Sequence, residues 1–273
     1  MLGAICGDVI GSVYEWHNVK TEDFDLFSRE SHFTDDTVMT AAVMDKLLSG
    51  DNSHGFFENR EAALEYAARF RQYYHRYSDA GFGSMFADWA KSTTGGRQKS
   101  YGNGAAMRVT PIGYAFDTLK EVLLEATISC GYTHNNPEAV KGARAVAGSV
   151  FLAHHGAGKE EIRSFVRREA GYRLDVRLEQ IRPDYIFDSR TSYSVPPAIQ
   201  AFLESSSFED ALRKAISIGG DSDTIACITG GIAEAYYKAI PKDLADKTLL
   251  RLDSGLRQLT KAFYERFNQE GKI

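Results

Sequence analysis

The sequence predicts an all-α protein built as a single compact domain, and three observations favour this fold class. Apolar residues recur with helical spacing along most of the 273 residues. No alternation of apolar and polar residues lasts long enough to predict a sheet. No linker rich in glycine, serine or proline divides the chain, so we expect residues 1–273 to form one domain.

The expected helices follow one another from the N-terminus. Residues 3–15 carry glycines at positions 3, 7 and 11, a spacing that gives a helix one smooth face for close packing. Segments 36–48 and 58–74 have apolar residues at offsets of three and four. The same spacing predicts further helices over residues 105–115, 119–129, 137–154, 159–168, 197–203, 208–217, 224–238 and 243–267.

Two of these helices, 137–154 and 224–238, are rich in glycine and alanine. A glycine inside a helix costs about 0.5–1 kcal/mol relative to alanine. It is tolerated where helices approach closely, so we expect both helices to be central and buried. Residues 171–194 lack clear periodicity and are expected to form a surface excursion or lid.

The composition excludes several classes of protein. Apolar residues make up 43% and charged residues 25%, and the net charge is −5, which argues against a broad basic face for nucleic acid. No apolar run approaches the ~20 residues that span a bilayer, and no basic leader precedes an apolar segment. The three isolated cysteines suit a reducing compartment, so we expect a cytoplasmic protein without a membrane partner.

Two acidic segments stand immediately before predicted helices. Residues 33–37 read Phe-Thr-Asp-Asp-Thr, and residues 219–224 read Gly-Gly-Asp-Ser-Asp-Thr. Each segment could simply be an N-cap, because such side chains accept the free amides of a first helical turn. One cap needs one acceptor, however, and two neighbouring carboxylates repel each other unless a cation or a proton compensates.

The chemistry of these side chains favours a hard divalent cation. Oxygen ligands without histidine or cysteine suit Mg²⁺, Mn²⁺ or Ca²⁺ and argue against Zn²⁺. The second segment is not an EF-hand loop, since Ala226 and Ile232 stand where that loop requires glycine and glutamate. Four acids at two helix starts would instead suit a two-metal site.

Three further segments carry weaker signals. Asp8 fits a structural role, whereas Glu15 stands at a helix end where its charge opposes the helix dipole and needs a partner. The Gly102-Asn103-Gly104 turn could leave amides free for an anion, although an ordinary tight turn is the favoured explanation. His134, before a proline that begins a helix, is more commonly a structural donor than a catalyst.

These five segments, in this order, resemble the ADP-ribosylglycohydrolase family. That family includes dinitrogenase reductase-activating glycohydrolase and the eukaryotic ADP-ribosylhydrolases. The stretch Gly-Asp-Val-Ile-Gly-Ser-Val-Tyr-Glu, which ends at Glu15, is especially similar to the ADP-ribosylhydrolase-3 branch. The resemblance covers about residues 3–237 and implies a compact orthogonal all-α fold, in which two divalent cations lie at the base of a cleft for ADP-ribose.

The resemblance also implies roles for individual residues. Catalytic roles fall to Glu15, Asp35 and Asp223, with Asp223 a bridge between the cations. The implied metal ligands are Thr34, Asp35, Asp36, Asp221, Asp223 and Thr224. The implied substrate-binding residues are Glu15, Gly102, Asn103, Gly104, Ala105, Met107 and His134. The segment 194–198 resembles one that approaches the ligand, and Glu234 stands where the family commonly has a small residue.

The implied activity is hydrolysis dependent on Mg²⁺ or Mn²⁺. The scissile bond would join the anomeric carbon of the distal ribose to an ADP-ribosylated protein or a small ADP-ribose adduct, with ADP-ribose as product. Two alternatives stay open, a catalytically silent ADP-ribose-binding module and a pyrophosphohydrolase. Arginine, serine, nucleic acid and O-acetyl groups all remain candidate acceptors, and we expect a monomer.

Overall fold

The computed structural model describes residues 1–50, 59–92 and 95–267, and these fold almost entirely into helices. Pairing of extended backbone within these ranges is limited to two isolated bridges, Lys99–His134 and Gly102–Arg190. The predicted all-α class is therefore confirmed. In chain order the elements are α1 (Leu2–Gly11), α2 (Asp35–Ser49), α3 (Asn59–Arg76), α4 (Ser84–Lys91), η1 (Asn103–Ala105), α5 (Ile112–Ala115), α6 (Leu119–Cys130), α7 (Pro137–His154), α8 (Lys159–Ala170), α9 (Leu178–Ile181), η2 (Arg182–Asp184), α10 (Thr191–Glu204), α11 (Phe208–Ser217), α12 (Ser222–Tyr237), α13 (Lys242–Leu249) and α14 (Ser254–Phe267).

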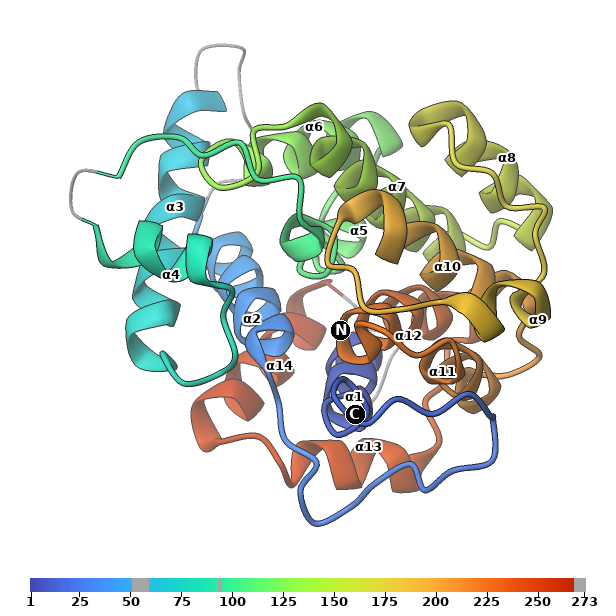
Figure 1. Cartoon of the computed structure of the whole chain (residues 1–273). Coiled ribbons are helices and arrows are strands. Elements are labelled where there is room, and N and C mark those ends of the chain that lie inside the picture. Colours follow the sequence, from blue (N-terminus) through green and yellow to red (C-terminus); the bar gives the residue numbers. More distant parts are fainter. Residues whose placement is uncertain (51–58, 93–94, 268–273) are drawn as a thin grey trace.

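The helices α1 and α12 lie side by side at the centre of the molecule, although they come from opposite ends of the chain (Figure 1). The glycines of α1 face the backbone of α12, as their spacing predicts. A Cβ atom on Gly11 would lie 2.5 Å from the Cα of Asp223, and one on Gly7 would overlap the carbonyl of Ala226. Only glycine permits this approach, which brings the C-terminal end of α1 against the N-terminal end of α12.

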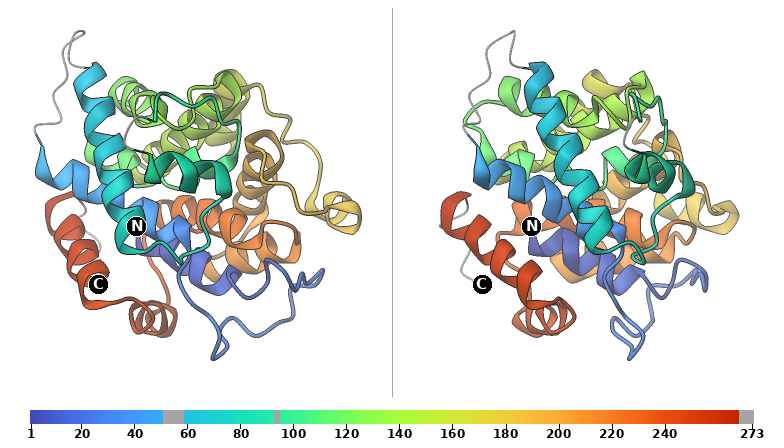
Figure 2. Two further views of the ribbon diagram at one scale, coloured as in Figure 1. Left: turned by 60° about the vertical axis from the view of Figure 1, so that its left-hand side comes forward. Right: turned by 90° about the vertical axis from the view of Figure 1, so that its left-hand side faces the viewer.

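The other helices surround this central pair. The two views in Figure 2 show α13 and α14 on one side of it and α5–α8 on another, with α10 and α11 beside α12. Residues 222–235 of α12 are all buried, and so are the glycines and most alanines of α7. The prediction that these two small-residue helices are central and buried is confirmed.

The structure corrects two predicted helices that ran through turns. Residues 105–115 are helical only in η1 and α5, because the turn begins at Asn103 and Pro111 occupies the N-cap of α5. Residues 243–267 form two helices instead of one. The carboxylate of Asp253 accepts the amide of Leu256 at 2.8 Å and so starts α14 afresh.

The start of α10 was also predicted wrongly, since the helix begins at Thr191 with Pro196 and Pro197 inside it. Proline lacks the amide that would bond the carbonyl four residues earlier. For Pro197 that carbonyl belongs to Tyr193, which instead accepts the hydroxyl of Tyr185 at 3.1 Å. The expected excursion over 171–194 thus contains α9, η2 and the first turn of α10, and α4 was not predicted at all.

Other predicted features are placed as follows. Glu58, the expected first residue of one helix, lies outside the described residues. The three cysteines are unpaired and buried. Across the described ranges, no helix is long and apolar enough to cross a membrane.

Candidate metal and substrate site

The acidic residues of three helices and one loop converge where α1 ends and where α2 and α12 begin. Asp8, Asp36 and Asp223 place one carboxylate oxygen each within 4.8 Å of one another. Glu15, Asp221 and Asp223 form a second such group. The two groups share Asp223, and we call these five residues the acidic site.

Local backbone geometry explains why α2 and α12 begin here. Thr34 has extended backbone, and its hydroxyl accepts the amide of Asp36, so that it caps α2. Before α12, Gly219 and Gly220 have φ angles of +76° and +72°. Other residues rarely adopt this left-handed conformation, so the glycines turn the chain just ahead of Asp221. The N-cap interpretation therefore holds for Thr34 and leaves the carboxylate of Asp36 uncommitted to capping, whereas Asp223 Oδ1 accepts the first-turn amide of Thr224 at 2.9 Å.

Asp8 takes a larger part than the sequence indicated. Its carboxylate accepts the amide and hydroxyl of Thr34, at 3.0 and 2.6 Å, and the amide and hydroxyl of Thr37. These bonds support the structural role that the sequence favoured. The same carboxylate also stands beside Asp36 and Asp223, which the sequence did not predict. The signal available was its place one helical turn before Gly11, on the face that meets α12.

The electrostatics of the acidic site favour a bound cation. Burial, reinforced by the neighbouring carboxylates, raises the pKa values of Asp36 and Asp223 well above the ordinary aspartate value. Burial likewise raises the pKa of Asp221 to about 6 and that of Glu15 to about 7, the latter with contributions from Asp223 and Asp8. Among the described residues, Asp36 Oδ1 is buried without a hydrogen-bond partner. An all-oxygen donor set with an unsatisfied buried oxygen fits a hard divalent cation.

The remaining predicted ligands surround these groups. Thr224 donates its hydroxyl to Asp36 Oδ2 at 3.1 Å. Thr34 lies against Asp8 and Asp36, as described above. Asp35 belongs to neither group of converging oxygens and is partly exposed, although burial and Asp223 raise its pKa well above the ordinary value. Asp35 is the first residue of α2 and lies at the edge of the acidic site.

The segment from Gly102 to Met107, here called the Gly-loop, borders the acidic site. The side-chain amide of Asn103 donates to Asp221 Oδ2 at 2.7 Å and to the hydroxyl of Ser194 at 2.9 Å. The Sδ atom of Met107 lies 3.9 Å from the hydroxyl oxygen of Thr224. The Gly-loop is thus more than a tight turn, because it joins the acidic site to the start of α10.

The structure corrects the expectation that the Gly-loop amides are free for an anion. The amide of Gly102 donates to the Ser100 hydroxyl at 3.1 Å, and that of Asn103 donates to the Ser189 carbonyl at 2.8 Å. Ala105 is fully buried. Gly102 and Gly104 are partly exposed, which leaves the two glycines as the open part of the loop backbone. His134 lies behind Gly104, with Nε2 3.1 Å from the position of an added Cβ.

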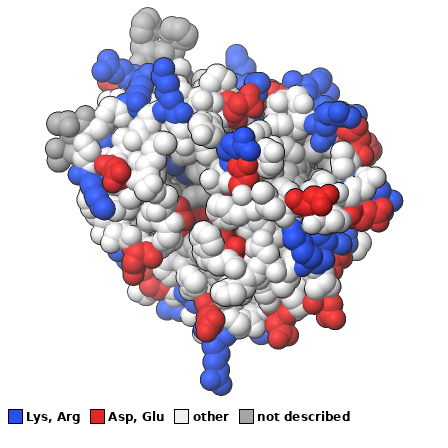
Figure 3. Space-filling view, viewed as in Figure 1, with Lys and Arg blue, Asp and Glu red and all other residues white. Residues whose placement is uncertain are grey.

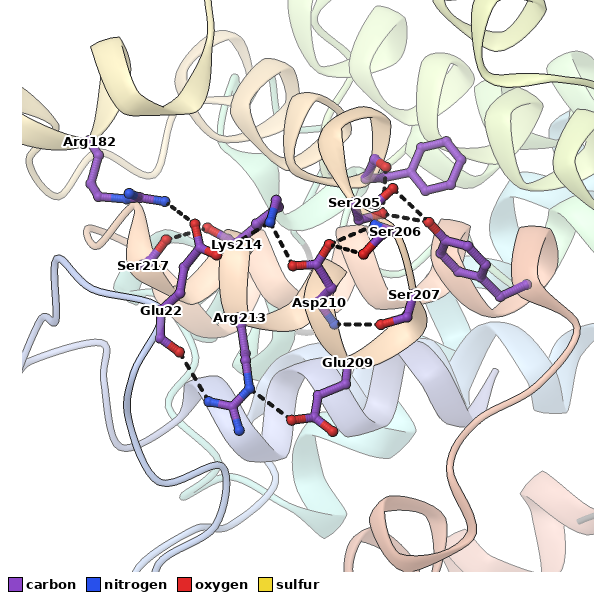
Figure 4. A network of polar contacts seen from close by, with 12 residues as sticks. Glu22, Arg182, Ser205, Ser206, Ser207, Glu209, Asp210, Arg213, Lys214 and Ser217 are labelled. Atoms are coloured by element: carbon purple, nitrogen blue, oxygen red, sulfur yellow. Dashed lines mark hydrogen bonds and ion pairs between the residues drawn. The ribbon is translucent and has the colours of Figure 1, made fainter.

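A polar network that the sequence did not predict joins the loop after Glu15 and the helix η2 to α11 (Figure 4). Glu22, in the loop that follows Glu15, accepts Arg182 at 2.6 Å and Lys214 at 3.3 Å. Arg213 donates to the backbone carbonyl of Glu22 at 3.1 Å. These contacts join segments up to 192 residues apart, so no local pattern could have revealed them.

Exposed aromatic side chains stand next to Glu15. Trp16 and Phe187 stack with ring centroids 5.3 Å apart, and Trp16 is 73% exposed. The stack connects the Glu15 loop with the segment between η2 and α10. On the face shown in Figure 3, acidic side chains lie near a hollow in the middle, while charges of both signs are scattered around the edge.

The Glu234 position, where a small residue was expected, is a buried polar junction. Its carboxylate accepts the amide of Gly3 at 2.8 Å, the N-terminal ammonium group and the hydroxyl of Tyr264. The larger side chain is accommodated because these donors satisfy it. The junction lies toward the N-terminal end of α1, away from the acidic site at the other end of that helix.

Comparisons with known proteins agree on one family. The profile of a family described as ADP-ribosylglycohydrolase matches residues 1–272. ADP-ribosylhydrolase ARH3 of Mus musculus is 28% identical over 314 aligned residues, which cover 87% of this chain and 82% of that protein. The human ADP-ribosylhydrolase ARH3 is 27% identical, with 87% and 84% covered.

A bacterial relative and a solved structure extend the comparison. ADP-ribosylarginine hydrolase Tri1 of Pseudomonas putida (strain GB-1) is 26% identical, with 100% of this chain and 79% of that protein covered. A solved structure titled "ADP-ribosylglycohydrolase-related protein complex" has a TM-score of 0.63 at 23% identity, and 97% and 96% of the two chains are covered. At that identity the likeness shows the shared fold.

Proposed function

The chain belongs to the ADP-ribosylglycohydrolase family and is a hydrolase, and from this premise we propose that its acidic site cleaves ADP-ribosyl adducts with the help of two divalent cations. The scissile bond is the one between the anomeric carbon of the distal ribose and the acceptor. The observation that carries the proposal is the pair of carboxylate groups that share Asp223, because two cations about 3.5–4 Å apart would need two neighbouring sets of oxygen ligands.

The acidic site supplies suitable ligands for Mg²⁺ or Mn²⁺. Asp8, Asp36 and Asp223 would hold one cation, and Asp221 and Asp223 the other, with Glu15 beside the second cation and with Thr34, Asp35 and Thr224 completing the two sites. Divalent cations bound there would polarise the ribose hydroxyls, lower the pKa of a bound water and neutralise the surrounding carboxylates.

Glu15 is the proton acceptor in this proposal. The carboxylate of Glu15 lies beside Asp221 and Asp223, where it would take a proton from the attacking water. The water oxygen bonds to the anomeric carbon as the bond to the acceptor breaks, and the acceptor departs with the electron pair and regains a proton. The surrounding carboxylates stabilise the oxocarbenium-like transition state.

The Gly-loop, with His134 behind it, would bind the ADP-ribosyl group beside the acidic site. Its open glycines allow close approach of a ligand, and Asn103 couples that contact to Asp221. We also propose a cytoplasmic location, with which the three unpaired, buried thiols are consistent. A single domain over residues 1–273 is our further proposal, supported by a family match over residues 1–272.

Product analysis tests the proposal. The purified protein is incubated with ADP-ribosyl-arginine, ADP-ribosyl-serine and O-acetyl-ADP-ribose in Mg²⁺, in Mn²⁺ and in a chelator. We expect ADP-ribose as product from at least one substrate, in the presence of a divalent cation only. Formation of AMP and a phosphoribosyl adduct that still carries the acceptor would indicate pyrophosphate cleavage instead. Tight ADP-ribose binding without turnover of any substrate would indicate a silent binding module.

A further inference from the structure

His134 stands at the end of a hydrogen-bond chain that begins at a buried arginine. Arg108 is 1% exposed, and its Nη2 donates to the Ser129 carbonyl at 3.2 Å and to Thr133 Oγ1 at 2.8 Å. Thr133 Oγ1 lies 2.8 Å from His134 Nδ1. Arg108, Thr133 and His134 are all buried, so bulk water does not compete strongly for these bonds.

The direction of these bonds determines which ring nitrogen of His134 carries the proton. A guanidinium group can only donate, so Thr133 Oγ1 is the acceptor in its bond with Arg108. The hydroxyl then has one proton to donate. Among the described residues, His134 Nδ1 is the acceptor within reach of that proton. A hydroxyl that donates to Nδ1 requires this nitrogen to be unprotonated, and in the neutral ring the proton then resides on Nε2.

The protonated nitrogen faces the Gly-loop. Nε2 lies 3.1 Å from the point where a Cβ of Gly104 would stand. Within the described part of the chain it makes no hydrogen bond, and the residue is 6% exposed. A directed donor without a protein partner, under a loop that borders the acidic site, is suited to an acceptor on a bound ligand.

The buried charge of Arg108 reinforces this arrangement. No described carboxylate forms an ion pair with the guanidinium group, which instead stacks 3.9 Å from the ring centroid of Phe70. Burial lowers the pKa of Arg108 to about 10, so that the group remains charged at neutral pH. Burial, together with this positive charge, lowers the pKa of His134 well below its ordinary value and keeps the ring neutral.

We propose that Arg108 and Thr133 are positioning residues that hold His134 as the Nε2–H tautomer, so that its ring donates a hydrogen bond to an oxygen of the ADP-ribosyl group at the Gly-loop. The ligand contact rests on the proposed function, whereas the tautomer is a property of the free protein. These hydrogen bonds explain why a neutral histidine, buried beside the fixed positive charge of Arg108, is suited to a position under the Gly-loop.

The tautomer is tested by NMR on the ¹⁵N-labelled full-length protein, since ring nitrogen shifts distinguish protonated from unprotonated sites. The His134 signals are assigned by their loss in His134→Gln. We expect the Nε2–H form in the wild type and in Thr133→Ser, which keeps the hydroxyl. Thr133→Val should shift the ring towards a mixture of tautomers. A wild-type Nδ1–H form, or an unchanged His134 signature in Thr133→Val, would overturn the proposal.

Binding of ADP-ribose is measured by calorimetry in saturating Mg²⁺ on the same proteins. Thr133→Val should bind about three- to tenfold more weakly, since one directed hydrogen bond is lost, and Thr133→Ser should recover the affinity. Thr260→Val is a matched control, because its buried hydroxyl donates to the Leu256 carbonyl and, within the described ranges, bonds nothing outside α14. Equal losses in both valine variants would indicate a general packing effect and contradict the proposal. A wild type that fails to bind ADP-ribose would instead overturn the proposed function.

Discussion

The side-chain amide of Asn103 donates a 2.7 Å hydrogen bond to Asp221, across 118 residues of sequence. It is the direct link between the Gly-loop and the acidic site. A bond to a charged acceptor orients that carboxylate and favours its ionised form, so hydrogen bonding from Asn103 acts to lower the pKa of Asp221. The bond therefore fixes the position of a candidate metal ligand relative to the Gly-loop.

Replacement of Asn103 by alanine should break this link. We expect the kcat/KM for the best substrate of the panel to fall about tenfold or more, because a hydrogen bond to a charged group is lost. Divalent affinity, measured by calorimetry, should fall as well. Ser194→Ala is the control, since it removes the other partner of Asn103 and leaves the bond to Asp221 in place. Equal effects of the two substitutions would contradict a specific role for the bond.

Among the candidate metal ligands, Asp223 is expected to be the one whose substitution has the largest effect, because it belongs to both groups of carboxylates. Asp223→Ala should abolish turnover and weaken the binding of Mg²⁺ and Mn²⁺, measured by calorimetry and by metal content after dialysis. Asp243→Ala changes the net charge equally at an exposed position on α13 and should change neither. Retention of both metal and turnover in Asp223→Ala would exclude the two-metal site.

Glu15 should affect the chemical step more than binding. Glu15→Gln keeps the shape of the side chain and removes its ability to accept a proton. We expect kcat to fall by about 10²–10⁴-fold, the usual contribution of a general base, while the Kd for ADP-ribose changes little. Rapid single-turnover measurements separate the two quantities. Turnover close to that of the wild type would remove Glu15 from the mechanism.

The stability of the metal-free protein should depend on pH through the acidic site. The pKa values of Glu15, about 7, and Asp221, about 6, lie above the ordinary values of 4.5 and 3.8 that apply to the unfolded chain. At pH values between the unfolded and the folded pKa values, the folded protein binds more protons than the unfolded one. Its free energy of unfolding therefore falls as the pH rises from about 4 to about 7.

Thermal unfolding in a chelator checks this prediction. We expect a higher Tm near pH 5.5 than near pH 8, and added Mg²⁺ should raise the Tm chiefly at the higher pH, where protons no longer neutralise the carboxylates. The double variant Glu15→Gln with Asp221→Asn should flatten the dependence. A metal-free Tm that rises towards pH 8 would show that the carboxylates are not destabilised by burial.

The contact between α1 and α12 should tolerate no added methyl group. In Gly7→Ala the new Cβ would overlap the backbone of Ala226, so one helix must move. We expect the free energy of unfolding to fall by about 1–3 kcal/mol or more in urea titrations. Gly83→Ala is the control, because nothing lies within 4 Å of an added Cβ there. Similar stabilities of the two variants would mean that α1 and α12 can separate at little cost.

Local patterns in the sequence determined much of the helical framework. The ranges 137–154 and 208–217 are helices as predicted, because their capping residues and apolar spacing agree. The glycine spacing of α1 and the small residues of α12 predicted close packing. The acid-rich segments at the starts of α2 and α12 also predicted candidate ligands for hard cations. Each segment spans only a few consecutive residues, so a local pattern was enough to reveal it.

Tertiary structure alone decided how these parts meet. Asp8 joins Asp36 and Asp223 because glycine contacts bring the C-terminal end of α1 against α12. Within α10, the carbonyl of Tyr193, which Pro197 leaves free, is satisfied by the hydroxyl of Tyr185 from outside the helix. The bond from Asn103 to Asp221 likewise depends on the packing of distant segments. Such relationships are set by long-range packing and by the need to satisfy buried polar atoms, neither of which leaves a local pattern in the sequence.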